Sequence, residues 1–321
     1  MVISVQDSIS SFLVNCQAKN LDPKSIWFYK THLDNFIEFL RIRHKDLSIS
    51  EIDSTVIRGF ILYLQSEKPQ RYGKEKGISE PGINRHIKVL KIFFRYMVRE
   101  GITEDNPMRN ISKLRVAKKQ TEAFTNFQVL RMLETAKEKK GFTGLRDFLL
   151  IHLLYDTGAR ISELLNLKLQ DVDLERRAFQ VVGKGKKERE VPLGRTSFEI
   201  LSEYRGVKER MFGENEYLFL TLQGGRLSRR QAAKTIERIG IKAGVQGVRV
   251  SPHTFRHTFA KNYLLNGGDV FSLKEILGHS DLETVQIYVN MDKKDIIDQY
   301  NKYNPGDKLT ASLLLRAGFQ H

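Results

Sequence analysis

The spacing of apolar side chains predicts a mainly helical chain. In four stretches of the first hundred residues, apolar positions recur every three or four residues, as on the buried side of an amphipathic helix. These stretches are residues 9–16, a longer one that opens at Asp22-Pro23, one that Asp53 can cap, and residues 81–100. Residues 66–80 are charged and predict a loop. We therefore predict a helical N-terminal domain over residues 1–105.

The pattern changes after this domain. The stretch GITEDNPMRNISKLRVAKKQTE loses the helical period and holds Gly, Asn-Pro and a basic cluster, so we predict a linker over residues 106–122. Helical periods return near 126–139, 144–156 and in GARISELLNLKL, and then near 196–206, 228–243, 252–266, 272–278 and 282–290. Between them, RAFQVVGKGKKEREVPL has two β-prone runs around a glycine and lysine turn, which predicts a hairpin. The second domain, residues 123–321, is thus predicted to be mainly α with a small antiparallel β-sheet.

Net charge indicates a polyanionic partner. The 321 residues include 53 Lys and Arg against 38 Asp and Glu, a formal charge of +15, and both predicted domains are basic. Two sets of basic residues at helical spacing are candidates to face a nucleic acid, although a solvated charged face is the alternative: Lys88, Lys91 and Arg95, and Arg230, Lys234 and Arg238.

Other features bear on location. The single cysteine, Cys16, fits a reducing compartment and lies on an apolar stripe. No run of about 18 apolar residues and no signal-peptide pattern occurs, so we expect a cytoplasmic protein with no membrane partner.

Two short stretches hold residues suited to phosphate chemistry. In SPHTFRHTF, His253 and Arg256 are three apart on one helical face, with His257 one step round. In DTGARISEL, Arg160 lies at a break between helices, three residues before Glu163. Arginines can clamp the oxygens of a pentacovalent phosphorane without a metal. Taken alone, each stretch also has a purely structural interpretation. The first fits an ordinary helix start, and the second fits an exposed arginine on a helix.

Such a site also needs an acid and a nucleophile. The hairpin turn offers Lys184, Lys186 and Lys187, and their spacing does not choose among them. In LGHSDLETVQIYVN, His279 precedes Tyr288 by nine residues. A tyrosine that attacks phosphorus conserves the energy of the diester, so the strand can be rejoined without ATP. Chemistry alone does not single out Tyr288 among eleven tyrosines. Neither HExxH nor GxSxG occurs, which disfavours a metal site and a serine nucleophile.

Four segments in this order resemble the tyrosine recombinase family, and most closely its Xer-type and integrase-like members. They are TGARISELLNLKLQDVD, VVGKGKKEREVPLG, SPHTFRHTFAKNYLLNGGD and LKEILGHSDLETVQIYVN. The resemblance implies the following active-site residues: Arg160, Lys184, His253, Arg256, His279 and the nucleophile Tyr288, supported by Glu163 and His257. It also implies a two-domain clamp around DNA, made of a helical core-binding (SAM-like) domain and a catalytic domain.

The same resemblance implies a site-specific recombinase that cleaves and rejoins DNA through a 3′-phosphotyrosyl intermediate and a Holliday junction. The expected partners are a double-stranded recombination site and a tetramer on that DNA, either of identical chains or with a paralogue. No metal or other cofactor is expected. The alternatives are a catalytically silent DNA-binding regulator and an enzyme like a type IB topoisomerase. The target sequence and the biological setting, whether dimer resolution, integration or transposition, do not follow from the residues.

Overall fold

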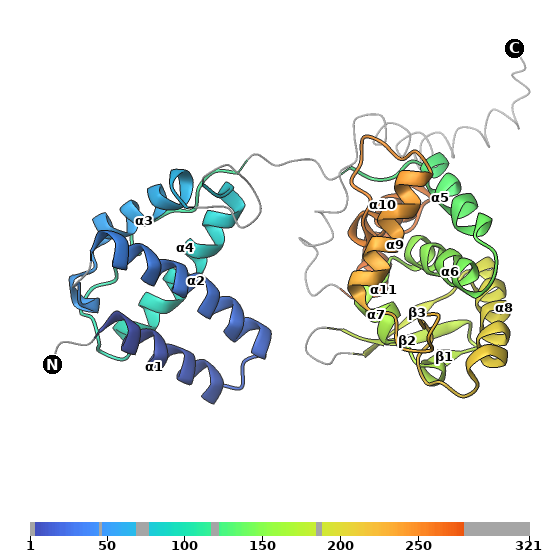
Figure 1. Cartoon of the computed structure of the whole chain (residues 1–321), viewed down its shortest axis with the longest axis horizontal. Helices are drawn as coiled ribbons and strands as arrows, with labels where there is room; N and C mark the ends of the chain where they lie inside the picture. The colour runs from blue at the N-terminus through green and yellow to red at the C-terminus, as the bar shows by residue number, and fades with distance from the viewer. Residues whose placement is uncertain (1–3, 45–46, 69–76, 117–121, 184–187, 279–321) are drawn as a thin grey trace, which may run out of the picture. The chain divides into compact units, whose positions relative to one another are not determined.

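A computed structural model describes residues 4–44, 47–68, 77–116, 122–183 and 188–278. The chain forms two compact units, Met1–Lys118 and Lys119–His321 (Figure 1). The predicted class is confirmed, because both units are helical and the second also holds a small antiparallel sheet. The predicted helix near 282–290 lies outside the described residues.

The described residues of unit 1 form four helices, α1 (Val5–Ala18), α2 (Pro23–Arg43), α3 (Ser54–Ser66) and α4 (Glu80–Arg99), with a short 3-10 turn η1 (Ile49–Glu51). Two carboxylates start helices as predicted. The Asp22 side chain accepts a hydrogen bond from the backbone N–H of Lys24, and Asp53 accepts from those of Thr55 and Val56. Because these caps involve residues only two or three positions apart, the helix starts could be predicted from the sequence.

Helix α4 separates its faces as the periodicity predicts. Its apolar residues Ile83, Ile87, Leu90, Phe94 and Met97 are all buried in the core of unit 1. The core extends beyond the helix, since Met108 and Ile111 are buried in it as well. The first part of the stretch predicted as a linker therefore packs on unit 1.

A histidine is buried between α2 and α4. The Nδ1 of His86 lies 3.0 Å from the carbonyl of Gly82, which can only accept, and its Nε2 lies 3.0 Å from the amide nitrogen of Asn35. The ring of His32 lies 4.5 Å from that of His86, centroid to centroid. Burial is the main cause that lowers the pKa of His86 to about 4. The neutral ring, with its proton on Nδ1, satisfies both neighbours.

This burial predicts that unit 1 loses stability in acid. The unfolded chain takes up a proton at His86 near pH 6.5, whereas the folded chain resists it until about pH 4. Stability from this group is therefore complete above pH 6.5 and is lost as the pH falls towards 4, by about 3 kcal/mol in total. Urea unfolding of the full chain, followed by the fluorescence of the single tryptophan Trp27, measures this slope. His86→Gln is the control, and an equal slope in both proteins between pH 6.5 and 4 contradicts the prediction.

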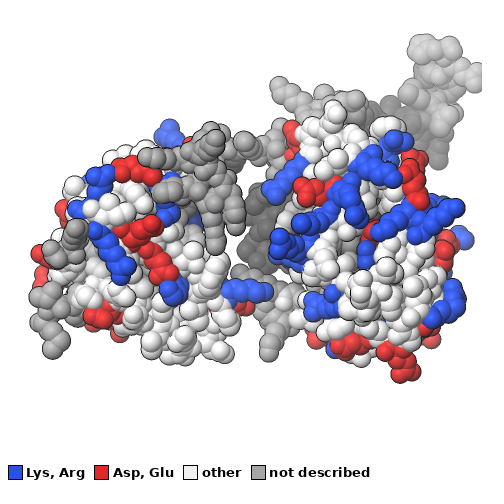
Figure 2. Space-filling model, viewed as in Figure 1, with Lys and Arg blue, Asp and Glu red and all other residues white. Residues whose placement is uncertain are grey.

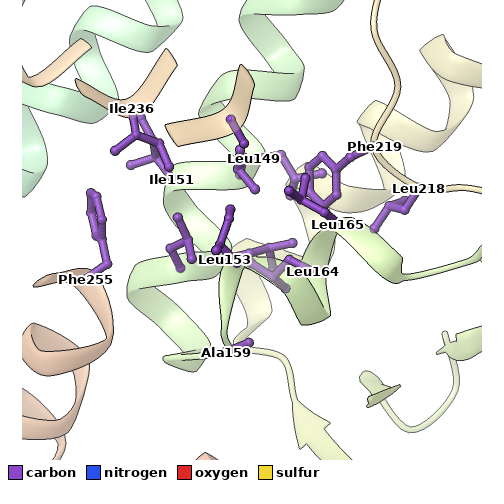
Figure 3. Close-up of a cluster of buried hydrophobic side chains, with 14 of the residues drawn as sticks. Leu149, Ile151, Leu153, Ala159, Leu164, Leu165, Leu218, Phe219, Ile236 and Phe255 are labelled. Atoms are coloured by element: carbon purple, nitrogen blue, oxygen red, sulfur yellow. The ribbon is translucent and has the colours of Figure 1, made fainter. Parts of the chain in front are cut away.

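Unit 2 is arranged around one central helix, α6 (Phe142–Thr157). In the described part of the unit, the helices are α5 (Asn126–Glu138), α6, α7 (Ile161–Asn166), α8 (Arg195–Phe212), α9 (Arg229–Lys242), α10 (Pro252–Leu265) and α11 (Val270–Leu277). Helix α6 packs against α5, α8 and α10, and buries Leu149, Ile151 and Leu153. Figure 3 shows these side chains beside Leu164 of α7 and Phe255 of α10. The core of unit 2 thus packs α7 and α10, which carry the candidate site, around the buried helix α6.

The sheet has one more strand than the predicted hairpin. Strands β2 (Ala178–Val182) and β3 (Glu188–Pro192) pair antiparallel, with Phe179 opposite Val191, and the short β1 (Val172–Asp173) pairs with the other edge of β2. Two residues are too few to give a period, which is why β1 was not predicted.

Helix α7 is shorter than its sequence suggests. The stretch GARISELLNLKL is helical only over Ile161–Asn166, followed by the 3-10 turn η2 (Leu169–Asp171). The backbone carbonyl of Leu167 accepts from the N–H of Leu218, and the N–H of Leu169 donates to the carbonyl of Glu216. These long-range pairs replace helical bonds and end α7.

Candidate active site

The site is built around the turn between α6 and α7. Helix α6 ends at Thr157 and is capped by Gly158, which takes the left-handed conformation with φ of 60°. A Cβ at Gly158 would lie 2.4 Å from the ring of Phe259 on α10, so only glycine fits there. Two residues later Arg160 caps α7. Its backbone N–H donates to Glu163 Oε2 at 2.7 Å, and its Nη1 donates to Glu163 Oε1 at 2.8 Å. The capping interaction thus fixes the position of the Arg160 guanidinium.

Glu163 is buried and receives a second arginine from the sheet. Arg189 of β3 donates from Nη1 to Oε1 and from Nη2 to Oε2, each at 2.9 Å. Burial acts to raise the pKa of the Glu163 carboxyl, yet the hydrogen bonds from Arg189 and Arg160 together hold it below its ordinary value. Glu163 is therefore an anion shared by two guanidinium groups.

Arg256 lies on α10, which begins as predicted with Ser251 as its cap and Pro252 in the first turn. Its side chain is only 2% exposed. Nη1 donates to the carbonyl of Gly158 at 2.8 Å, and Nη2 donates to the carbonyl of Leu277 at 2.7 Å. Helix C-termini carry partial negative charge, so the ends of α6 and α11 stabilise this buried cation.

His253 lies one turn before Arg256 on the exposed side of α10. Partial loss of hydration, and then the positive charges of Arg229, Arg256 and Arg160, lower the pKa of His253. The imidazole is therefore neutral at pH 7 and able to accept a proton. His257, one residue after Arg256, is buried.

The structure brings together the described members of the predicted set. Arg160, Glu163, Arg256 and His253 share one region at the junction of α6, α7 and α10, which the hydrogen bonds of Arg256 and Arg189 tie to the end of α11. Lys184, His279 and Tyr288 lie outside the described residues.

Arg189 was missed in the sequence. The signal was present, because Arg189 and Val191 are two apart on a strand and point to the same face. Val191 is buried, so an arginine on its face must meet an anion or a row of acceptors. The identity of that anion could not be read, since Glu163 is 26 residues away.

The candidate DNA-facing residues lie on the outside of their helices. Lys88 and Arg95 of α4 are exposed and Lys91 is half-buried, while Arg230, Lys234 and Arg238 of α9 are all exposed. Figure 2 shows Lys and Arg gathered in a band on the viewed face of unit 2, over the part where α9 and α10 lie. Such a face suits a polyanion, and which of these residues contact DNA stays a prediction.

The described residues hold neither a metal-binding cluster nor a membrane-spanning helix. No group of three or more His, Cys, Asp or Glu is placed there to hold a metal ion. No helix in the described part of the chain has the length and apolarity needed to cross a membrane.

Comparison with known families decides the class. Residues 122–295 match the model of the phage integrase family, and residues 7–116 match the model of the phage integrase SAM-like domain. The chain belongs to the phage integrase family, the tyrosine recombinases. It is therefore an enzyme of site-specific DNA recombination, which cleaves and rejoins DNA strands.

The relatives of this recombinase span nearly its whole length. It is 33% identical over 312 residues to the tyrosine recombinase XerC of Thermodesulfovibrio yellowstonii, covering 95% of this chain and 98% of the relative. It is 32% identical over 291 residues to XerD of Oceanobacillus iheyensis, covering 89% and 94%. The resemblance inferred from the four segments is confirmed, and the regulator and topoisomerase alternatives are not favoured.

Solved structures support the same fold for the recombinase. The XerH recombinase bound to a palindromic difH substrate, a post-cleavage complex, has a TM-score of 0.72 at 25% identity and covers 91% of this chain and 83% of that one. A lambda integrase dimer bound to a COC′ core site has a TM-score of 0.69 at 17% identity, covering 91% and 98%, and shows the fold alone.

Proposed function

We propose that this recombinase cuts one strand of duplex DNA by attack of the Tyr288 hydroxyl on a backbone phosphate. The Tyr288 oxygen forms a bond to phosphorus, and the bond from phosphorus to the 5′-oxygen breaks. The products are a 3′-phosphotyrosyl link and a 5′-hydroxyl. A 5′-hydroxyl from the partner duplex then attacks the link and releases the tyrosine, so two such rounds exchange strands through a Holliday junction.

The observation that carries this proposal is the cluster of guanidinium groups next to a neutral imidazole. Arg160 and Arg256 are the proposed clamps for the nonbridging oxygens of the phosphate, whose negative charge grows in the transition state. His253 has a lowered pKa and is the proposed acceptor of the Tyr288 proton. The family resemblance assigns Lys184 as the acid for the leaving 5′-oxygen and His279 as a phosphate ligand.

Support for the proposed clamps comes from how they are held. The guanidinium of Arg256 is fixed by two carbonyls, and that of Arg160 by Glu163. Groups fixed before the reaction need no reorganisation as charge develops. We assign Glu163 and the buried His257 to supporting this arrangement rather than to contact with DNA.

The proposed partner is a double-stranded recombination site bound by both units. The solved relatives bound to DNA and the exposed Lys and Arg on α4 and α9 support this assignment. Exchange between two duplexes uses four active sites, so we propose a tetramer on DNA, of identical chains or with a paralogue. The tail residues Leu309, Leu313, Leu314 and Ala317, outside the described part of the chain, are a candidate contact between protomers, and packing on their own domain is the equal alternative.

Covalent trapping tests the proposal. Nicked suicide duplexes from the gene's own neighbourhood are incubated with the protein in excess chelator and run on a denaturing gel. We expect a protein-DNA adduct whose yield is the same with and without chelator, because arginines replace the metal. An adduct that forms only when divalent metal is supplied contradicts the proposed mechanism.

A further inference from the structure

Arg189 joins three parts of unit 2 that are far apart in the sequence. It lies on β3 with its side chain 12% exposed. Besides its two bonds to Glu163, its Nε donates to the carbonyl of Ile276, near the end of α11, at 2.9 Å. One guanidinium therefore connects the sheet, the first turn of α7 and the C-terminus of α11.

The bonds to Glu163 bear on Arg160. The Arg160 side chain is 33% exposed, and Glu163 Oε1 is the anion that holds its Nη1. Arg189 contacts both oxygens of the same carboxylate, which fixes the rotation of that group. Because Arg189 holds the Glu163 carboxylate in one orientation, Oε1 is a fixed acceptor for the Arg160 guanidinium.

The contact with α11 is shaped for an arginine. Gly278, directly after α11, has φ of 64°. A Cβ built on it would lie 2.9 Å from both Cδ and Nη1 of Arg189. The backbone thus comes close to the guanidinium, and the same part of α11 supplies the Leu277 carbonyl that holds Arg256.

Lysine cannot replace this arrangement. An ammonium group is a point charge without the planar fork that matches both oxygens of a carboxylate, and it has no equivalent of Nε to reach Ile276 at the same time. An exposed ion pair tolerates such an exchange because it contributes little. The Arg189–Glu163 pair is largely buried, so the geometry of its hydrogen bonds matters.

We propose that Arg189 is a positioning residue for strand cleavage, which sets the Arg160 clamp through Glu163. This inference rests on the proposed role of Arg160 in binding the scissile phosphate. It makes the position of the Arg160 guanidinium depend on Arg189, and so on strand β3 of the sheet.

The test compares Arg189→Lys with Arg195→Lys in the full chain. Arg195 is 83% exposed and pairs with Glu199 on α8. Arg195→Lys is therefore a matched control, because it makes the same exchange at an exposed ion pair. Cleavage is measured as the single-turnover rate of adduct formation on the suicide duplex that captures the wild type. DNA affinity is measured by gel shift, and the folded fraction by circular dichroism. We expect Arg189→Lys to slow cleavage roughly 10- to 100-fold, with affinity within about threefold of wild type.

A double-variant cycle tests whether Arg189 acts through Glu163. In a Glu163→Gln background, the further loss caused by Arg189→Lys should be much smaller than in the wild type. Equal losses in both backgrounds overturn the proposed route. A cleavage rate like that of Arg195→Lys, or a loss explained fully by unfolding or weaker DNA binding, overturns the positioning role while wild-type cleavage still stands. A wild type that forms no adduct on DNA that it binds overturns the proposed function, and this inference with it.

Discussion

Replacing Tyr288 by phenylalanine is expected to abolish covalent capture of DNA and to leave DNA binding unchanged. Phenylalanine keeps the ring and removes the hydroxyl oxygen that forms the bond to phosphorus. We expect adduct formation to fall at least ~10⁴-fold, since loss of a nucleophile removes the whole covalent route. The measurement is the denaturing-gel trap with the nicked duplex, beside a gel shift on the same DNA.

The chain offers a matched control for this exchange. Tyr300 follows twelve residues later in the same C-terminal part of the sequence, and Tyr300→Phe removes the same atom. It should form the adduct at the wild-type rate. An adduct that persists in Tyr288→Phe and disappears in Tyr300→Phe would move the nucleophile to the second tyrosine.

The second large effect is expected at Arg256. Arg256→Met keeps much of the side-chain length and removes the charge and the two donors to Gly158 and Leu277. Two buried carbonyls then lose their partners, which lowers the free energy of unfolding by about 2–4 kcal/mol. Loss of one preorganised clamp for the phosphate slows cleavage by a further ~10²–10³-fold.

Urea unfolding and single-turnover adduct formation separate these two losses. The rate is corrected for the folded, DNA-bound fraction, so that instability does not count as lost chemistry. Arg195→Met, on the exposed face of α8, removes one positive charge without touching the site. If the corrected rate of Arg256→Met equals that of the control, Arg256 has only a structural role.

The pKa shift of His253 links the two predictions. A tyrosine hydroxyl has an ordinary pKa near 10 and keeps its proton at pH 7, so it needs an acceptor as it attacks. Partial burial, and then the positive charges of Arg229, Arg256 and Arg160, lower the pKa of His253 and so favour the neutral imidazole. The positive charge that would bind a phosphate therefore also favours the unprotonated form of His253, the proposed proton acceptor.

The amino-acid sequence by itself determined most of the helices, the β2–β3 hairpin and the local pairs of charged residues in the site. The helix starts at Asp22, Asp53 and Ser251 could be predicted because a capping side chain bonds to backbone groups two or three residues away. The pairs Arg160–Glu163 and His253–Arg256 could be placed for the same reason, since three residues separate the members of each. The order of four motifs then indicated the family.

Only the tertiary structure decided which of these local features meet. The Arg189–Glu163 pair spans 26 residues, and the Arg256–Gly158 bond spans 98. Such contacts depend on how β3, α10 and α11 pack around α6 and α7, and no local pattern of apolar or polar residues encodes that packing. The early end of α7 has the same origin, because the backbone groups of Leu167 and Leu169 bond to residues 216–218 instead of continuing the helix. Local hydrogen bonds determine where helices begin, whereas burial of the common core determines which charges become neighbours.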